Sequence, residues 1–193
     1  MNTFIQSTDT ALIKRFQEGN NDALETLIRR HEEKIFSSIF FLVKDEYLAE
    51  DLFQDVFIKI IDKLRKKQYN EEGKFLPWAL RISHNLCIDY FRKIKRTPTI
   101  TTSDNRDIFE VINVVADSPE VELMRKQSHQ LVTTMLQSLP EEQREVIVLR
   151  FIAGLNFKDI SKVTNCSINT ALGRMRYGLI NLRKLMIEKE IAL

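Results

Sequence analysis

The sequence has few of the residues that interrupt regular structure. Its 193 residues include only five glycines and four prolines, which argues against a turn-rich β fold and favours long helices. The two cysteines, Cys87 and Cys166, lie far apart, so they indicate reduced thiols rather than a disulfide-stapled secreted domain. No Cys/His cluster has the spacing of a zinc site, and we expect no metal and no cofactor. No apolar run reaches the length of a membrane span.

The charge distribution is more informative than the formal net charge of +2. Between Thr97 and Glu122 the chain has six acids and one arginine, a net charge of −5, so the remainder carries +7. The basic excess therefore lies on two flanking parts, where a polyanion could bind. The N-terminus lacks a signal-peptide pattern, and we expect a cytoplasmic protein without membrane insertion.

The clearest helical pattern is FLPWALRISHNLCIDYFRKIKR, from Phe75 to Arg96. Apolar residues recur at three- and four-residue steps, as on the buried face of a helix. A second stripe carries Arg81, Asn85, Arg92 and Arg96, with one nearby acid, Asp89. Cations suit phosphates and an amide can read a base edge, so this stripe is a candidate nucleic-acid surface. On charge alone, an ordinary solvated face is the simpler interpretation.

Helices are also predicted before this stretch. One is capped by Asp9 or Thr10, and another begins near Asp45. Within the second of these, Asp51, Gln54 and Asp55 share one side of the helix, which is either a solvated face or a docking surface for a basic partner. In the polar loop 66–74, Tyr69 either stacks on an unpaired base or packs back on the domain.

The composition changes after Arg96, and the pattern predicts an all-α protein of two small helical domains. The domains are 1–96 and 119–193, and residues 97–118 form a flexible acidic linker. Near the C-terminus, a short helix 157–163, a tight turn 164–167 and a helix capped by Ser167 predict a helix-turn-helix. We expect its last helix to bury Ala171, Met175, Leu179, Leu182 and Met186. The opposite side presents Asn169, Thr170, Gly173 and Tyr177, flanked by Arg174 and Arg176.

Several functions remain open on these residues alone. A conventional helix-turn-helix regulator with an N-terminal sensing domain would need an apolar ligand pocket and would bind duplex DNA by itself. A nuclease or recombinase would need more carboxylates than Asp51, Asp55 and Asp89, which form no recognisable metal set. A helical adaptor that binds only protein is disfavoured by the basic stripe.

Three segments, in order, resemble the extracytoplasmic-function (ECF) sigma factors of bacterial RNA polymerase. The segments are AEDLFQDVFIKII, FLPWALRISHNLCIDYFRKIKR and LPEEQREVIVLRFIAGLNFKDISKVTNCSINTALGRMRYGLINLRK. The resemblance covers nearly the whole chain outside the linker. At Leu172, Gly173 and Tyr177 the chain departs from residues common in the family.

The resemblance implies a non-enzymatic protein that binds core RNA polymerase and promoter DNA, and it leaves room for an anti-sigma factor as a further partner. It implies polymerase docking by Asp51, Gln54 and Asp55. Recognition of the −10 element would then use Tyr69, Arg81, Asn85, Asp89, Arg92 and Arg96. Recognition of the −35 element would use Asn169, Thr170, Gly173, Arg174, Arg176 and Tyr177.

Overall fold

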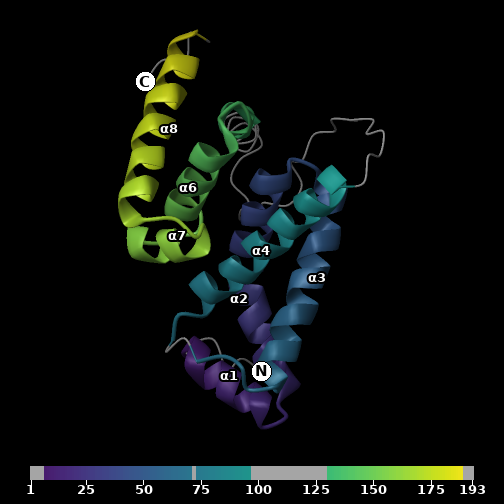
Figure 1. The fold of residues 1–193 in the computed structure, drawn as a ribbon. Helices are drawn as coiled ribbons and strands as arrows, with labels where there is room; N and C mark the ends of the chain where they lie inside the picture. Colours follow the sequence, from purple (N-terminus) through teal and green to yellow (C-terminus); the bar gives the residue numbers. More distant parts are fainter. Residues whose placement is uncertain (1–6, 71–72, 97–129, 189–193) are drawn as a thin grey trace, which may run out of the picture.

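A computed structural model describes residues 7–70, 73–96 and 130–188, and within these ranges the only regular structure is helical (Figure 1). The helices are α1 (Asp9–Gln17), α2 (Asn21–Val43), α3 (Glu46–Arg65), α4 (Phe75–Arg96), α6 (Glu141–Phe151), α7 (Phe157–Val163) and α8 (Ile168–Glu188). Residues 130–137 are also helical. The predicted all-α class is therefore confirmed. The linker predicted at 97–118 and the domain start at 119 lie outside the described residues.

The first helix begins one residue earlier than predicted. Its cap is Thr8, whose hydroxyl accepts a hydrogen bond from a backbone N–H three residues later, so the prediction of Asp9 or Thr10 was wrong. Asp9 instead binds α2, accepting hydrogen bonds from Arg30 at 2.6 Å and pairing with His31 at 2.8 Å. Burial alone would raise the pKa of Asp9, but the hydrogen bonds and charges of His31 and Arg30 outweigh it and lower that pKa.

The N-terminal unit, residues 7–70 and 73–96, packs α1, α3 and α4 against α2. Its central side chains are fully buried, among them Leu12, Leu27, Ile35, Ile60 and Phe75. Helix α3 begins beside Asp45, as predicted, and the Asp45 carboxylate caps it by accepting a hydrogen bond from the backbone N–H of Leu48. Helix α4 lies across the bundle (Figure 1).

Two sides of α4 are buried rather than one. Phe75 and Trp78 lie in the N-terminal core, as the apolar spacing predicted. Leu80, Ser83 and Cys87 are buried as well, on a second side that the apolar spacing did not indicate. A two-faced amphipathic helix has one buried side, so this second burial requires a further partner.

The predicted helix-turn-helix is present, formed by α7, the turn 164–167 and α8. Ser167 caps α8 as predicted, its hydroxyl accepting the backbone N–H of Thr170 at 3.0 Å. Of the predicted seam, Ala171 and Met175 are buried, and Leu182 and Met186 are half-buried. The prediction for Leu179 was wrong, because its side chain is 45% exposed. The buried line runs from Met175 to Gly178 instead, one position before Leu179.

Gly178 allows α8 to lie close to α6. A Cβ added at Gly178 would lie 2.8 Å from the Ile147 Cδ1 atom and 3.3 Å from the Gln143 Cβ atom. At Gly173, five residues earlier on the same helix, an added Cβ would meet nothing within 4 Å. Helix packing therefore explains the glycine at position 178 and does not explain the one at position 173.

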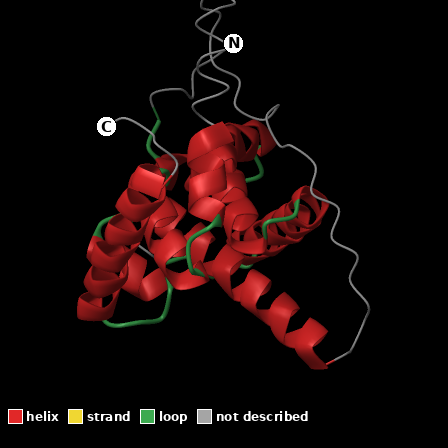
Figure 2. Cartoon of the chain, turned by 90° about the horizontal axis from the view of Figure 1, so that it is seen from above, coloured by secondary structure: helices red, strands yellow, loops and turns green. Residues whose placement is uncertain are grey.

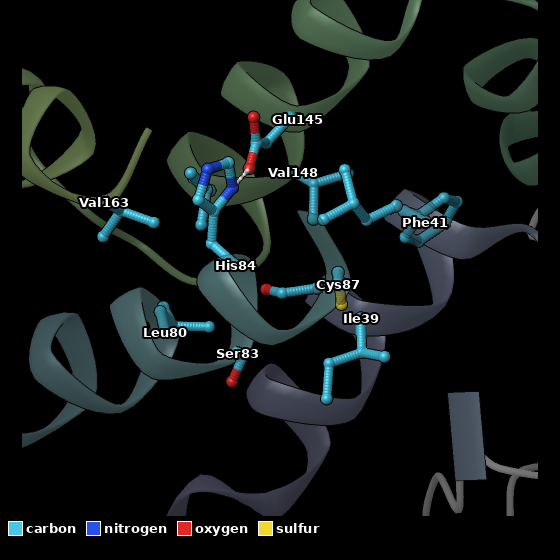
Figure 3. Close-up of a pocket in the computed structure, with 12 residues that line it drawn as sticks. Ile39, Phe41, Leu80, Ser83, His84, Cys87, Glu145, Val148 and Val163 are labelled. Carbon is cyan, nitrogen blue, oxygen red and sulfur yellow. Dashed lines mark hydrogen bonds and ion pairs between the residues drawn. The ribbon is translucent and has the colours of Figure 1, made fainter. Parts of the chain in front are cut away.

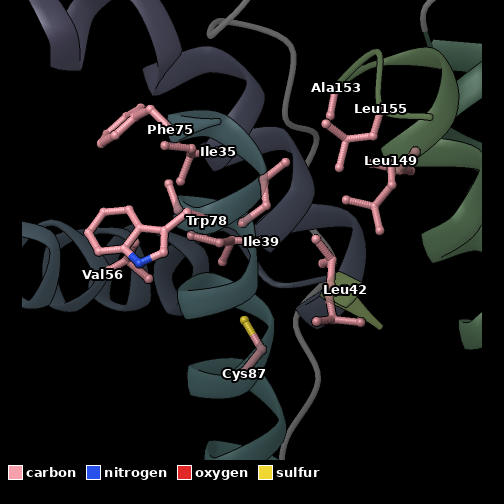
Figure 4. Close-up of a cluster of buried hydrophobic side chains, with 14 of the residues drawn as sticks. Ile35, Ile39, Leu42, Val56, Phe75, Trp78, Cys87, Leu149, Ala153 and Leu155 are labelled. Carbon is pink, nitrogen blue, oxygen red and sulfur yellow. The ribbon is translucent and has the colours of Figure 1, made fainter. Parts of the chain in front are cut away.

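The C-terminal unit, residues 130–188, packs directly on the N-terminal unit. Helix α6 contacts α2, and α7 contacts α4. Buried apolar residues of both units form one continuous cluster, in which Leu42 faces Leu149, Ala153 and Leu155 (Figure 4). The view from above shows the helices of both units lying against one another (Figure 2). This packing supplies the partner that the second buried side of α4 requires.

None of the helices within the described ranges is both long and apolar enough to cross a bilayer.

Gly178→Val is expected to destabilise the protein by about 1–3 kcal/mol, because the added methyl groups enter the contact between α8 and α6. The matched change Gly173→Ala enters open space and should stabilise α8 by about 0.5–1 kcal/mol, the helical preference of alanine over glycine. Thermal and urea unfolding measure both. Equal effects of the two substitutions would show that α6 and α8 do not approach at Gly178.

Candidate nucleic-acid interface

The polar stripe of α4 lies on a side of the helix that neither buried surface uses. Asn85, Asp89 and Arg92 are exposed, and Arg81 is half-buried. Arg92 lies 3.5 Å from the Asp89 carboxylate in an ion pair whose side chains are 68% and 70% exposed. Pairs this open contribute little to stability, so Arg92 remains available to a phosphate. The side chain of Arg96 lies outside the described residues.

The Asn85 side chain on this stripe is exposed. Among the described residues, its exposed amide has no hydrogen-bond partner. The alternative that this amide bridges helices inside the N-terminal unit therefore has no contact to support it. An exposed amide that both donates and accepts suits the hydrogen-bonding edge of a base.

Tyr69 packs back on its own unit. Its ring meets Trp78 edge to face with centroids 5.0 Å apart and lies 6.3 Å from the Phe75 ring. Its hydroxyl oxygen is buried. In this arrangement Tyr69 contributes to the packing around Trp78 and is not presented as a platform for a base.

The residues predicted on α8 divide into two groups. Asn169, Thr170, Arg176 and Tyr177 are exposed, and the Thr170 hydroxyl lies 2.8 Å from that of Ser167. Arg174 is half-buried and forms a 2.8 Å ion pair with Glu142 of α6. The exposed group lies on the outer side of the helix-turn-helix, and Arg174 turns toward α6.

A polar cleft of about 560 Å³ separates the two units on this side. One wall comes from α4 and carries Asn85, Asp89 and Arg92. The opposite wall includes Glu142 and Arg174, together with Glu141, Glu145 and the turn residues Thr164 and Asn165. The structure thus brings part of the predicted −10 set and one residue of the predicted −35 set to the same space.

The predicted docking set lies elsewhere, on α3. Asp51, Gln54 and Asp55 are all exposed along one side of that helix. Two large apolar side chains lie on the same side and are highly exposed for residues of their kind, Tyr47 at 71% and Ile58 at 64%. Sequence reasoning missed both, although steps of four, three and four residues link positions 47, 51, 54 and 58.

Two further residues missed by sequence reasoning meet between the units. His84 of α4 lies 2.5 Å from the Glu145 carboxylate of α6, and each side chain is less than one sixth exposed (Figure 3). Cys87 lies beneath this pair, where burial, followed by the charge of Glu145, raises its pKa to about 12. A thiol with so high a pKa is inert at neutral pH, so Cys87 acts here as a small buried apolar residue.

Within residues 7–70, 73–96 and 130–188, no group of three or more His, Cys, Asp or Glu residues is arranged to hold a metal ion.

Comparison with known proteins shows which protein family this chain matches. The family model described as Sigma-70 region 2 matches residues 27–97, and the one described as Sigma-70, region 4 matches residues 129–172. The RNA polymerase sigma-H factor of Pseudomonas aeruginosa is 29% identical, over 88% of this chain and 89% of its own. The ECF RNA polymerase sigma-E factor of Haemophilus influenzae is 27% identical, over 88% and 90%.

A solved structure shares the fold. CnrH, determined in complex with the cytosolic domain of CnrY, superposes with a TM-score of 0.63 over 93% of this chain and 97% of its own, at 23% identity.

The chain therefore belongs to the sigma-70 family of RNA polymerase sigma factors, in its ECF branch. As a sigma factor it binds RNA polymerase and directs the polymerase to promoters, and it is not an enzyme. The resemblance noted in the sequence is confirmed, and the regulator, nuclease and adaptor alternatives are set aside.

Asn85→Ala is expected to leave the stability of the free protein within about 0.5 kcal/mol of wild type, because this side chain is exposed and forms no hydrogen bond among the described residues. Trp78→Ala on the same helix is the contrasting control and should cost about 3–5 kcal/mol. Thermal melts followed by circular dichroism measure both. A large loss of stability for Asn85→Ala would assign the amide a structural role.

Proposed function

We propose that three helices divide the work of promoter recognition and opening. Helix α3 docks on core polymerase, α4 reads and helps to open the −10 element, and α8 reads the −35 element. The observation that carries the proposal is the exposed stripe of α4. On this stripe the Asn85 amide has no hydrogen-bond partner among the described residues, and Arg92 forms only an exposed ion pair. The domains 1–96 and 119–193 remain our prediction for the boundaries of the two recognition modules.

Docking on α3 is proposed to combine polar and apolar contacts. Tyr47 and Ile58 lie at the two ends of the Asp51, Gln54 and Asp55 set, and all five face solvent. Large exposed apolar side chains beside polar groups are typical of protein interfaces. A partner helix carrying arginines would pair with the carboxylates and cover the two apolar residues.

Reading of the −10 element is proposed to depend on Asn85. An unpaired base presents a hydrogen-bonding edge that an amide can match with one donor and one acceptor. Arg81, Arg92 and Arg96 follow the same stripe and would hold neighbouring phosphates. Tyr69 would join this site only if its ring left the packing with Trp78.

Opening of the DNA follows from binding preference. If α4 binds an extruded base more tightly than a stacked one, the difference in binding free energy drives local melting. No covalent chemistry is required of the protein.

Reading of the −35 element is proposed to use the outer side of α8. The N-terminal turns of a recognition helix meet base edges in the major groove, which suits Asn169 and Thr170. Gly173 has open space around it, so close approach to a DNA backbone remains as the reason for a glycine there. Arg176 and Tyr177 are exposed beside it and would contact the duplex.

A cytoplasmic location is proposed because RNA polymerase acts on DNA there. The similar protein CnrH was solved with the cytosolic domain of CnrY, and we propose that this chain also has an anti-sigma partner. Affinity purification of the tagged chain, with and without core polymerase present, tests this partner.

Asp51→Ala combined with Gln54→Ala is expected to weaken core polymerase binding about tenfold or more, because each lost contact to a charged partner is worth about 1.5–3 kcal/mol. Affinity is measured by fluorescence anisotropy of the labelled sigma factor. The matched control, Glu32→Ala with Glu33→Ala, removes two exposed acids of α2 and should bind normally. Wild-type affinity with normal helicity in the α3 variant would refute the docking surface.

Asn85→Ala is expected to spare core binding and impair opening at the −10 element, with a loss of about 1–3 kcal/mol, the scale of one good base contact. Permanganate footprinting of polymerase–promoter complexes measures the opening. A template already melted over the −10 element should recover the part of the defect due to opening and keep the part due to base reading. Normal footprints on several promoters would remove Asn85 from the recognition site.

A further inference from the structure

The start of α8 is uncharged on its exposed side and partly apolar. None of its exposed side chains up to Leu172 is ionisable. The one charged residue in 168–175, Arg174, is half-buried and paired with Glu142 of α6. Ile168 and Leu172 are each 44% exposed, although large aliphatic side chains are usually buried. The turns of a helix-turn-helix that meet base edges therefore present hydrocarbon in this chain.

Exposed cations precede and follow this neutral segment along the chain. They are Lys158 and Lys162 on α7, and Arg176, Arg183 and Lys184 on α8. Steps of three, four and seven residues link positions 169, 172, 176 and 183, so these side chains follow one side of α8. In a duplex, phosphates border the groove and the bases lie between them, which matches cations that flank a neutral segment. This pattern favours DNA over a protein partner for the exposed Leu172.

The surface beside Leu172 is open. A Cβ added at Gly173 would meet nothing within 4 Å. Because position 173 has no side chain, a base pair can come close to the Leu172 methyl groups. Leu172 follows Ile168 by about one helical turn, or roughly 6 Å along the axis, so both fit within a major groove about 12 Å wide.

An aliphatic side chain in the major groove has a preferred target. The apolar group that distinguishes the bases there is the C5-methyl group of thymine. Contact between leucine and this methyl group removes apolar surface from water on both partners. Contact between leucine and a donor or acceptor of another base would displace water from that polar group without replacing its hydrogen bond. Both effects favour thymine opposite Leu172.

We propose that Leu172 is a specificity-determining residue of α8, which selects thymine in the −35 element through contact with the C5-methyl group. The proposal rests on the proposed function of α8 and adds the base that this helix prefers. Asn169 and Arg176, three residues before Leu172 and four after it, contact groups beside that thymine. Phosphate contacts supply affinity for any sequence, and Leu172 adds the preference for one base.

The test uses the full-length chain bound to core polymerase, with duplex fragments whose −35 region is randomised. Repeated rounds of binding give the selected sequences. Each thymine of the selected −35 element, on either strand, is then replaced by uracil, which lacks the C5-methyl group and keeps the same hydrogen-bonding groups. Fluorescence anisotropy of the labelled duplex measures the affinity.

The wild-type chain is expected to select thymine at one or two positions and to bind the uracil duplex about fourfold more weakly there, the effect of one methyl group removed from water. Leu172→Ala should reduce this thymine-to-uracil ratio to about one, because the shorter side chain does not reach the methyl group. Leu172→Met keeps an apolar side chain of similar volume and should keep the ratio.

Leu179→Ala is the matched control, because Leu179 is 45% exposed and lies about 10 Å further along α8. It should leave the thymine-to-uracil ratio as in wild type. A selected −35 element without thymine, or the same ratio in wild type and Leu172→Ala, would overturn the proposal. Weaker binding of core polymerase by Leu172→Ala, with the ratio unchanged, would assign Leu172 to a protein interface instead.

Arg176→Ala separates this inference from the proposed function of α8. If α8 faces the duplex, this change weakens binding of all selected sequences by a similar factor and reduces the salt dependence. If neither Arg176→Ala nor Leu172→Ala alters DNA binding, the proposed function of α8 fails, and the role of Leu172 fails with it. If only Arg176→Ala alters it, α8 faces DNA and the role of Leu172 alone is refuted.

Discussion

The structure depends on α4, because three sides of this helix have three different environments. One side is buried in the N-terminal core through Phe75 and Trp78, and a second is covered by the C-terminal unit at Leu80 and Cys87. Only the remaining side is polar and exposed. A helix confined on two sides holds its third in a fixed direction, which suits a surface that must meet DNA in one register.

The same confinement links recognition to the arrangement of the units. The residues that cover α4 come from α6 and α7, and α8 packs on both of these helices. Helices α6, α7 and α8 therefore form one packed group of helices beside α4. The surface proposed for the −10 element and the one proposed for the −35 element are linked through these contacts.

Local sequence patterns predicted most of the fold, because caps and apolar spacing act within a few residues. Asp45 and Ser167 cap the helices that they were expected to begin, and the helix from Phe75 to Arg96 has the predicted bounds. Leu179 was assigned to the wrong side of α8 because a helical repeat allows either a three-residue or a four-residue step. From Met175 the four-residue step leads to Leu179, whereas the three-residue step leads to the buried Gly178. Gly178 was not identified from the sequence, because a residue without a side chain does not contribute to the apolar pattern.

The contacts between the units could not be predicted in the same way. His84 and Glu145 are 61 positions apart, and neither residue looks unusual among its neighbours. Their meeting depends on how two separately patterned units pack, which no local period encodes. For the candidate site, the spacing of polar residues singled out side chains of α3, α4 and α8, and the family resemblance supplied their expected roles. Which of the described ones are exposed came from the structure.

The apolar character of the contact between α2 and α6 has a thermal consequence. Separating Phe41 and Leu42 from Val148 and Leu149 would hydrate apolar surface, and such hydration carries a positive heat-capacity change. Contacts of this kind weaken as water is cooled, whereas the hydrogen bond that the Arg144 side chain of α6 donates to the Phe41 carbonyl of α2 does not depend on apolar hydration. Any separation of α6 from α2 would therefore depend on temperature, through the amount of apolar surface that it exposes to water.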